Sequence, residues 1–403
     1  MEHAGDFIQL ADRMNLLPPY LFGRLNRIKQ EKRSQGIDVI DLAMGNPNDP
    51  TPGPVVEKLC EVVCDSRNHR YSVASGIYNL RREIARYYEK QYGVSLRPES
   101  EVICTIGSKE GVSHLSLALL GPGDEVIVPV PAFPIHVYSA VIAGASVISV
   151  PVGDDEALLR SVDALCRERK PAPKVLFLNS PHNPTTRTVT LPFFEEAVRL
   201  ASKHRFVIVH DFAYGRVTFD GYEAPSLLQV PGAKDVAVEF GTLSKSYNMA
   251  GWRVGYCVGN PKIVEALGKI KGYYDYGLFQ AIQIASIIAL RDCEDFIGEQ
   301  AKIYEGRRDV LCDGLNAMGW AVEKPKASMF VWTRIPEPFR PMGSMEFSIR
   351  LIEEAEVVVS PGIGFGAEGE GHLRIALVEN EHRIRQALRQ MKRILNGRLQ
   401  ATA

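Results

Sequence analysis

The feature that most constrains the fold of this chain is the alternation of short apolar segments with longer helical segments between residues 100 and 260. The short segments are rich in Val, Ile and Leu, and we expect strands at 102–106, 125–130, 145–152, 175–178 and 206–209. Strands that are apolar on both faces belong in a mostly parallel sheet with helices on both sides. The pattern therefore predicts an α/β fold in which the loops after the strands meet at one edge of the sheet.

The pattern changes after Gly319, where shorter strands and helices follow one another without regular alternation. We expect strands at 320–323, 329–334 and 373–377, and helices at 344–356 and 379–395. This change indicates a second, smaller α+β domain. The domains predicted are an N-terminal arm with part of the small domain (1–45), a large domain (46–290) and a small C-terminal domain (291–403).

Composition excludes several classes of protein. The chain has 403 residues and a formal net charge of -1, so electrostatics give no reason to expect nucleic acid as a partner. No apolar run approaches the ~18 residues of a membrane span, and the N-terminus lacks the features of a signal peptide. The seven cysteines are scattered, and neither they nor the nine histidines show metal-ligand spacing. We therefore expect a cytoplasmic protein with no metal, no membrane and no nucleic-acid partner.

A lysine follows the strand expected at 236–240, in a segment rich in hydroxyl groups. Lys245 lies close in sequence to Thr242, Ser244, Ser246 and Arg253. Hydroxyl groups and a guanidinium are suitable partners for a phosphate. A lysine beside a phosphate site suggests a Schiff base with pyridoxal phosphate (PLP). The alternative from this segment alone is a solvated surface lysine.

The turns after the other strands also carry residues suited to a cofactor. Ser108 and Lys109 begin a helix, whose first N–H groups attract anions. Phe133 can stack on a flat ring, Asn183 can bond a phenolic oxygen, and Asp211, with Tyr214 on the same turn, can hold a proton on a pyridine nitrogen. Each residue also has a structural interpretation: a helix cap for Ser108 and Asp211, core packing for Phe133 and a turn for Asn183. Their occurrence at successive turns favours a cofactor site.

Other residues suggest how a substrate is bound. Arg374 lies in an apolar strand, and burying it requires either a structural carboxylate or a substrate carboxylate. Gly45 lets the backbone approach a ligand closely. Tyr20 either packs against the core or reaches the site, and the tyrosines at 273–276 either pack at a subunit interface or line the site.

Taken together, these residues resemble those of the class I/II aminotransferases, PLP enzymes with the aspartate aminotransferase fold (fold type I). The resemblance extends from about Pro18 to the last helix. It implies a large domain with a seven-stranded sheet. The matching motifs are Met44-Gly45-Asn46-Pro47, Tyr71, Gly107-Ser108-Lys109, Asn183-Pro184-Thr185, Asp211 with Tyr214, Ser244-Lys245 with Gly251-Trp252-Arg253, and Leu373-Arg374.

The resemblance also implies a role for each candidate residue. Lys245 forms the internal aldimine with PLP and then moves the proton between Cα and the cofactor. Asp211 pairs with the ring nitrogen. The remaining roles are ring-hydroxyl binding by Asn183 and Tyr214, ring stacking by Phe133, phosphate binding by Ser108, Lys109 (mainly its backbone), Thr242, Ser244 and Arg253, and substrate carboxylate binding by Arg374 with Gly45 and Asn183. Tyr71 is expected to reach the phosphate of a neighbouring subunit, which implies a homodimer.

Within the family, three segments look most like bacterial alanine (glutamate–pyruvate) transaminases: 242–253, 275–277 and 360–366. The expected reaction is ping-pong amino transfer from an amino acid, alanine first, to 2-oxoglutarate. LL-diaminopimelate aminotransferases and broad aliphatic or aromatic aminotransferases are the alternatives within the family. A PLP lyase on the same fold differs in its products. A non-catalytic PLP-binding regulator usually carries a DNA-binding segment, for which this chain has no room.

Overall fold

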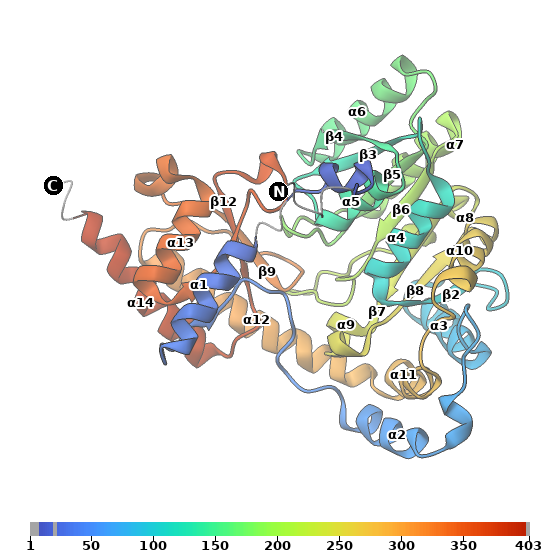
Figure 1. Cartoon of the computed structure of the whole chain (residues 1–403), viewed down its shortest axis with the longest axis horizontal. Helices are drawn as coiled ribbons and strands as arrows, with labels where there is room; N and C mark the ends of the chain where they lie inside the picture. The colour runs from blue at the N-terminus through green and yellow to red at the C-terminus, as the bar shows by residue number, and fades with distance from the viewer. Residues whose placement is uncertain (1–7, 19–21, 400–403) are drawn as a thin grey trace, which may run out of the picture.

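A computed structural model of the chain describes residues 8–18 and 22–399. Its largest element is a seven-stranded sheet with the order β2-β8-β7-β6-β5-β3-β4 (Figure 1). β8 runs antiparallel to β2 and β7, and the other neighbouring strands are parallel. The predicted α/β fold with a mostly parallel seven-stranded sheet is therefore confirmed. The strands are β2 (Val102–Ile106), β3 (Glu125–Val130), β4 (Ser146–Pro151), β5 (Val175–Asn179), β6 (Val207–Asp211), β7 (Ala237–Thr242) and β8 (Val254–Gly259).

Helices cover both faces of this sheet. Successive strand residues point to opposite faces, so Val102 and Cys104 enter one apolar core while Ile103 enters the other. One core is closed by α4 (Gly107–Leu119), α5 (Pro134–Ile142) and α10 (Pro261–Tyr274). The other is closed by α2 (Gly53–Val63), α3 (Tyr78–Tyr92), α6 (Asp155–Glu168), α7 (Leu191–His204), α8 (Ala233–Val236) and α11 (Gln280–Asp292). This double cover explains why the strands are apolar on both faces.

A second, smaller group of elements lies to one side of the sheet, drawn in orange and red beside the blue α1 in Figure 1. It contains the antiparallel sheet β11-β12-β9 and the parallel pair β1 and β10. Its own apolar core is separate from the two cores of the large sheet. The elements are α1 (Phe22–Ser34), β1 (Ile40–Asp41), α12 (Glu294–Ala317), β9 (Phe330–Arg334), α13 (Gly343–Ala355), β10 (Val357–Val358), β11 (Ser360–Pro361), β12 (His372–Ala376) and α14 (Glu381–Leu399).

The strand expected at 320–323 is wrong, because the segment has no regular structure. The side chain of Asn316 bonds the backbone of Val322 in both directions, accepting from its N–H at 2.9 Å and donating to its C=O at 3.0 Å. These bonds use the backbone N–H and C=O groups of Val322 that a neighbouring strand would otherwise bond. The Trp320 indole is buried in the small core and donates to the Arg334 carbonyl at 2.8 Å, so the apolar residue here packs in the core without belonging to a strand.

The domain boundaries expected at 45/46 and 290/291 stay a prediction. Among the helices that the structure describes, none combines the length and the apolar character needed to cross a bilayer.

Candidate active site

The candidate residues gather where the parallel strands of the large sheet end. β6 ends at Asp211, β5 leads into the loop with Asn183, and β7 leads directly into the short helix α9 (Leu243–Ser246), which carries Lys245. β2 leads into α4, so Ser108 lies in the first turn of that helix. The prediction that the loops after the strands converge is confirmed for these four turns by the strand pairing.

Lys245 lies within this convergence, partly buried. Its Nζ donates a hydrogen bond to the Gly45 carbonyl at 2.5 Å. Burial lowers the pKa of Lys245 to about 8, the positive charges of Arg374 and Arg253 act in the same direction, and Asp211 opposes them. A lysine with this pKa has far more neutral amine near neutral pH than an ordinary lysine, which favours a role as a nucleophile or general base.

Asp211 is buried and is held by a residue that the sequence did not single out. One carboxylate oxygen lies 2.9 Å from His136 Nε2, and the His136 ring stacks on Phe177 with centroids 5.8 Å apart. Because a carboxylate only accepts hydrogen bonds, His136 carries its proton on Nε2 in this pair. The bond and the stacking together fix the direction in which the carboxylate points.

Asn179 connects the loops that carry Asp211 and Asn183. Its Nδ2 donates to the Asp211 carbonyl at 2.8 Å, and its Oδ1 accepts the Asn183 N–H at 2.8 Å. Tyr214, on the turn after Asp211, is buried against Phe330. Burial raises the pKa of Tyr214, so its phenol stays neutral and can donate a hydrogen bond.

The turn at 106–108 and the first turn of α4, called the phosphate cup below, are where the sequence predicts that the phosphate of PLP binds. The first N–H groups of a helix lack partners within the helix, and here they belong to Gly107, Ser108 and Lys109. A Cβ on Gly107, whose φ is +73°, would lie 2.3 Å from Arg253 Nη2. A methyl group here would displace the guanidinium from the turn, and the positive φ favours glycine. Arg253 itself has φ +58°, an uncommon conformation for a residue with a side chain.

Two predicted phosphate ligands are engaged locally. The Thr242 hydroxyl donates to the Val254 carbonyl at 2.8 Å and accepts the Ser244 N–H at 3.1 Å, which caps α9. Both side chains are buried at the end of β7. Their proposed contact with the phosphate stays a prediction.

Arg374 is buried and held on several sides. Its Nη1 donates to Asn183 Oδ1 at 2.7 Å, and its Nη2 donates to the Ala43 carbonyl at 2.9 Å. The guanidinium lies over the rings of Phe330 and Phe365, at 4.0 and 4.6 Å from their centroids. These contacts fix the planar group in one orientation, which is suited to a carboxylate that arrives from the cavity.

A cavity of about 320 Å³ adjoins Arg374 and Phe133. Most of its wall is apolar, and Asn26, Lys109 and Tyr138 add polar groups. The Lys109 ammonium lies 5.9 Å from the centroid of the half-buried Phe133 ring. The cavity therefore has two cationic side chains, Arg374 and Lys109, on its wall.

One predicted site residue that the structure describes is not brought into this group. Tyr71 is 90% exposed, and its ring packs on the ring of Tyr276, with the two ring centroids 5.4 Å apart. Tyr20 lies outside the described residues. Sequence reasoning also missed Asn179, His136 and Ser360, whose hydroxyl lies 3.3 Å from Arg374 Nη2. The position of Asn179 at the end of an expected strand was the signal that could have drawn attention to it.

Comparisons with known proteins agree with this geometry. Residues 37–391 match the family described as aminotransferase class I and II. The chain is 52% identical over 380 residues to the glutamate-pyruvate aminotransferase AlaC of Escherichia coli, covering 94% of this chain and 92% of that protein. It is 40% identical to the LL-diaminopimelate aminotransferase of Moorella thermoacetica, covering 96% and 99% of the two chains.

Solved structures show the same similarity. A double mutant of Thermus thermophilus aspartate aminotransferase superposes with a TM-score of 0.88 and 30% identity, covering 96% of this chain and 100% of that one. The aromatic aminotransferase of Pyrococcus horikoshii superposes with a TM-score of 0.85 and 28% identity, covering 96% and 98%.

Proposed function

The chain belongs to the class I and II aminotransferases, which depend on PLP, and we propose that it moves an amino group between L-alanine and 2-oxoglutarate. The proposed chemistry rests on one observation. Lys245 lies near Arg374, whose guanidinium is held in place by Asn183 and the Ala43 carbonyl. The 52% identity with a glutamate-pyruvate aminotransferase supports the choice of substrates.

Lys245 is the proposed nucleophile and general base. PLP, when bound, supplies an electron-withdrawing ring that weakens the Cα–H bond of the attached amino acid. Because the pKa of Lys245 is lowered to about 8, its neutral amine is available to take the proton from the substrate Cα. The resulting ammonium then gives up this proton later in the amino transfer. The Gly45 carbonyl, 2.5 Å from Nζ, orients the amine.

The other residues hold the cofactor in place. We assign Asp211, fixed by His136, to the ring nitrogen, and Asn183 and Tyr214 to the ring hydroxyl. Phe133 covers one face of the ring. The phosphate is assigned to the first turn of α4 at Ser108 and Lys109, and to Thr242, Ser244 and Arg253.

Substrate recognition is assigned to Arg374 and to the adjoining cavity. The Arg374 fork binds the α-carboxylate, with Asn183 and the backbone at Gly45 beside it. An apolar wall accommodates the methyl group of alanine. We propose Lys109 as the second cation, which receives the distal carboxylate of 2-oxoglutarate or glutamate.

LL-diaminopimelate is the second candidate substrate. It is favoured by the 40% identity, over 96% of the chain, with an LL-diaminopimelate aminotransferase. Its distal end carries both an amine and a carboxylate, so it places different demands on Lys109 than 2-oxoglutarate does. Both candidate substrates would use the same residues around PLP. They would differ in the contacts that their distal groups make in this cavity.

We also propose a cytoplasmic homodimer. Several large aromatic side chains lie exposed at the end of α10, on the turn that follows it, and at the loop at 71–73. Association of two copies would bury them and would bring Tyr71 towards the phosphate of the partner subunit. They are Tyr71 (90% exposed), Tyr273 (85%), Tyr274 (64%) and Tyr276 (58%).

The test is an absorbance titration of the purified protein loaded with PLP. L-alanine is expected to convert the bound aldehyde cofactor to its amine form, and 2-oxoglutarate is expected to restore it. Lys245→Ala is the control in which neither change occurs at a normal rate. Conversion by LL-diaminopimelate, with none by alanine, would replace the leading candidate with the second one.

A further inference from the structure

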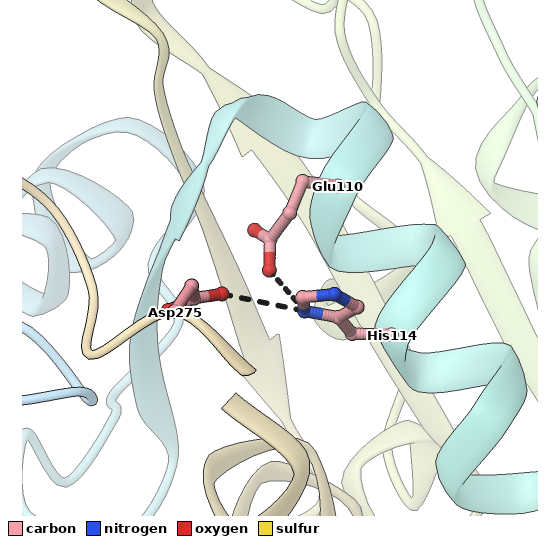
Figure 2. A group of neighbouring side chains, drawn as sticks. All are labelled: Glu110, His114 and Asp275. Atoms are coloured by element: carbon pink, nitrogen blue, oxygen red, sulfur yellow. Dashed lines mark ion pairs between the residues drawn. The ribbon is translucent and has the colours of Figure 1, made fainter. Parts of the chain in front are cut away.

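A group of charged side chains, partly buried around a fully buried lysine, lies beside the phosphate cup and takes no part in the chemistry described above. Glu110 and His114 lie one turn apart on α4, and Asp275 follows the end of α10 (Figure 2). His114 Nδ1 contacts Glu110 Oε1 and lies 3.4 Å from Asp275 Oδ2. Lys271, whose side chain is 0% exposed, donates to Glu110 Oε1 at 3.0 Å and to Asp275 Oδ2 at 3.0 Å.

Lys271 is the cation of this group. The ligand atoms of Glu110, His114 and Asp275 lie within 4.8 Å of one another, a spacing that also suits a metal ion. However, the lysine ammonium already bonds both carboxylates. Although burial raises the pKa of Glu110, the hydrogen bond from His114 and the charge of Lys271 outweigh it and lower that pKa to about 2. The lysine ammonium therefore already lies between the two carboxylates, where a metal ion would have to bind.

One end of the group reaches the phosphate cup. The second oxygen of Glu110, Oε2, accepts the Ile106 N–H at 2.8 Å. Ile106 immediately precedes Gly107 and Ser108, and its carbonyl lies 3.5 Å from Arg253 Nη2. Glu110 therefore fixes the backbone at the point where β2 turns into α4, and this turn aims the first N–H groups of the helix.

The other end reaches the aromatic edge that carries Tyr276. Asp275 Oδ1 accepts the Gly277 N–H at 2.7 Å and closes the turn on which Tyr276 has φ +53°. A Cβ on Gly277 would lie 3.0 Å from the Val73 carbonyl, so this turn packs closely on the loop after Tyr71. Lys271 is bonded to the carboxylates that hold both turns.

We propose that Lys271 is a positioning residue, which holds the phosphate-binding turn at 106–108 and the turn at 275–277 in fixed relation through Glu110 and Asp275. The phosphate cup is thereby shaped before the cofactor arrives. Loss of Lys271 leaves Glu110 without its buried cation, and the carboxylate can no longer hold the Ile106 N–H in the same place. This inference rests on the proposed phosphate site.

The test compares PLP with pyridoxal, which lacks the phosphate, as ligands of the full-length apoprotein. The dissociation constants of both are measured by absorbance titration for the wild type and for Lys271→Met. We expect the preference for PLP over pyridoxal to fall by about tenfold or more, the size typical when an outer partner of a ligand-binding group is removed. The dissociation constant of pyridoxal itself is expected to change little. A general loss of structure would weaken both ligands alike.

Additional variants test the route through the network. Asp275 contacts no residue of the turn at 106–108, so a fall in the PLP preference of Asp275→Asn shows that its effect passes through the group formed by Glu110, His114 and Lys271. The effects of Asp275→Asn and Lys271→Met are expected to be less than additive, as for residues of one network. The double variant Lys271→Met/Glu110→Gln removes both the lysine and the Glu110 charge that would otherwise be left without its cation. It is used if Lys271→Met alone does not fold. Lys203→Met, which breaks the ion pair between Lys203 on α7 and Asp163 on α6, is the matched control and should leave the preference unchanged.

The outcomes separate this inference from the proposed function. If the wild type itself does not prefer PLP to pyridoxal, the phosphate site is wrong. If it does, and Lys271→Met keeps the preference, the phosphate site stands and the role of Lys271 is wrong. A fall in the wild-type preference after treatment with a metal chelator would also overturn the inference, since a metal would then hold the two carboxylates.

Discussion

At the scale of single residues, Lys245 shows how the site trades stability for reactivity. Its pKa is lowered from 10.5 to about 8, because burial and two neighbouring arginines disfavour the ammonium form. Below pH 8 the folded and unfolded chains both carry the proton, so the cost of burying the charge is present in full. Between pH 8 and 10.5 only the unfolded chain keeps the proton, and stability rises with pH.

We therefore expect Lys245→Met to stabilise the apoprotein at pH 7 by about 1–3 kcal/mol, the order given by a lysine pKa lowered to this extent. The gain should shrink as the pH approaches 10.5. Urea unfolding of the apoprotein at pH 7 and pH 10 measures it, with Lys203→Met as the surface control. Equal stability of variant and wild type at pH 7 would contradict the lowered pKa.

Arg374 is the second residue whose contribution can be isolated. A lysine at this position keeps the positive charge but loses the planar fork that we propose binds the α-carboxylate. We expect Arg374→Lys to raise the KM for alanine by about tenfold to a hundredfold, equivalent to about 1.5–3 kcal/mol for a hydrogen bond to a charged group. Steady-state kinetics check this prediction, and the dissociation constant of PLP serves as the control because it should change little. An unchanged KM would exclude Arg374 from carboxylate binding.

At the scale of secondary-structure elements, the junction between β2 and α4 is the most constrained part of the site. A methyl group on Gly107 would collide with Arg253 Nη2 at 2.3 Å, and the φ of +73° disfavours any side chain. We expect Gly107→Ala to weaken PLP binding by more than about tenfold, because the added methyl group strains the turn and displaces the exposed Arg253 guanidinium beside it. Pyridoxal binding should fall much less.

A matched control lies at the other end of the same helix. A methyl group on Gly121, just beyond the end of α4, would meet no atom within 4 Å. Gly121→Ala should therefore leave PLP binding unchanged. Equal loss of PLP in both variants would indicate that the helix as a whole, not the cup, had been disturbed.

The elements of the large sheet were predictable because each one is determined by its own sequence. β2 and β3 occupy the ranges expected from their runs of Val and Ile. The segment at 320–323 has a similar apolar pattern, but the side chain of Asn316 takes the backbone bonds of Val322 that a ladder would use. Whether an apolar segment finds a strand partner depends on its tertiary neighbours, which local pattern does not contain.

The same distinction applies to the site. Lys245, Asp211 and Asn183 could be predicted from the sequence, because each follows an expected strand and matches a family motif. His136 was not, because its link to Asp211 spans 75 positions and depends on the packing of α5 against β5 and β6. Lys271 was missed for the same reason, since its carboxylate partner Glu110 lies on another helix.

At the scale of the whole molecule, the exposed edge at Tyr71 leaves one predicted phosphate ligand outside its own site. Tyr71 is 90% exposed and packs on Tyr276, whose turn is held by Asp275 and Lys271. If two copies associate through this edge, each site contains Lys245 from one subunit and Tyr71 from the other. Variants of the two residues should then complement each other within mixed dimers.

We expect Lys245→Ala and Tyr71→Phe subunits, each poorly active alone, to regain activity when they are unfolded together and refolded. Random association makes about half of the dimers mixed, and each mixed dimer has one complete site, so recovery should approach about a quarter of the wild-type activity. Sedimentation of the mixture establishes the oligomeric state, and a mixture of Lys245→Ala with Arg374→Ala tests the alternative arrangement. Because Lys245 and Arg374 lie in the same chain's site, subunits carrying those two changes should not complement each other. Recovery by both mixtures would show that sites are shared differently, and recovery by neither would place Tyr71 outside the partner's site.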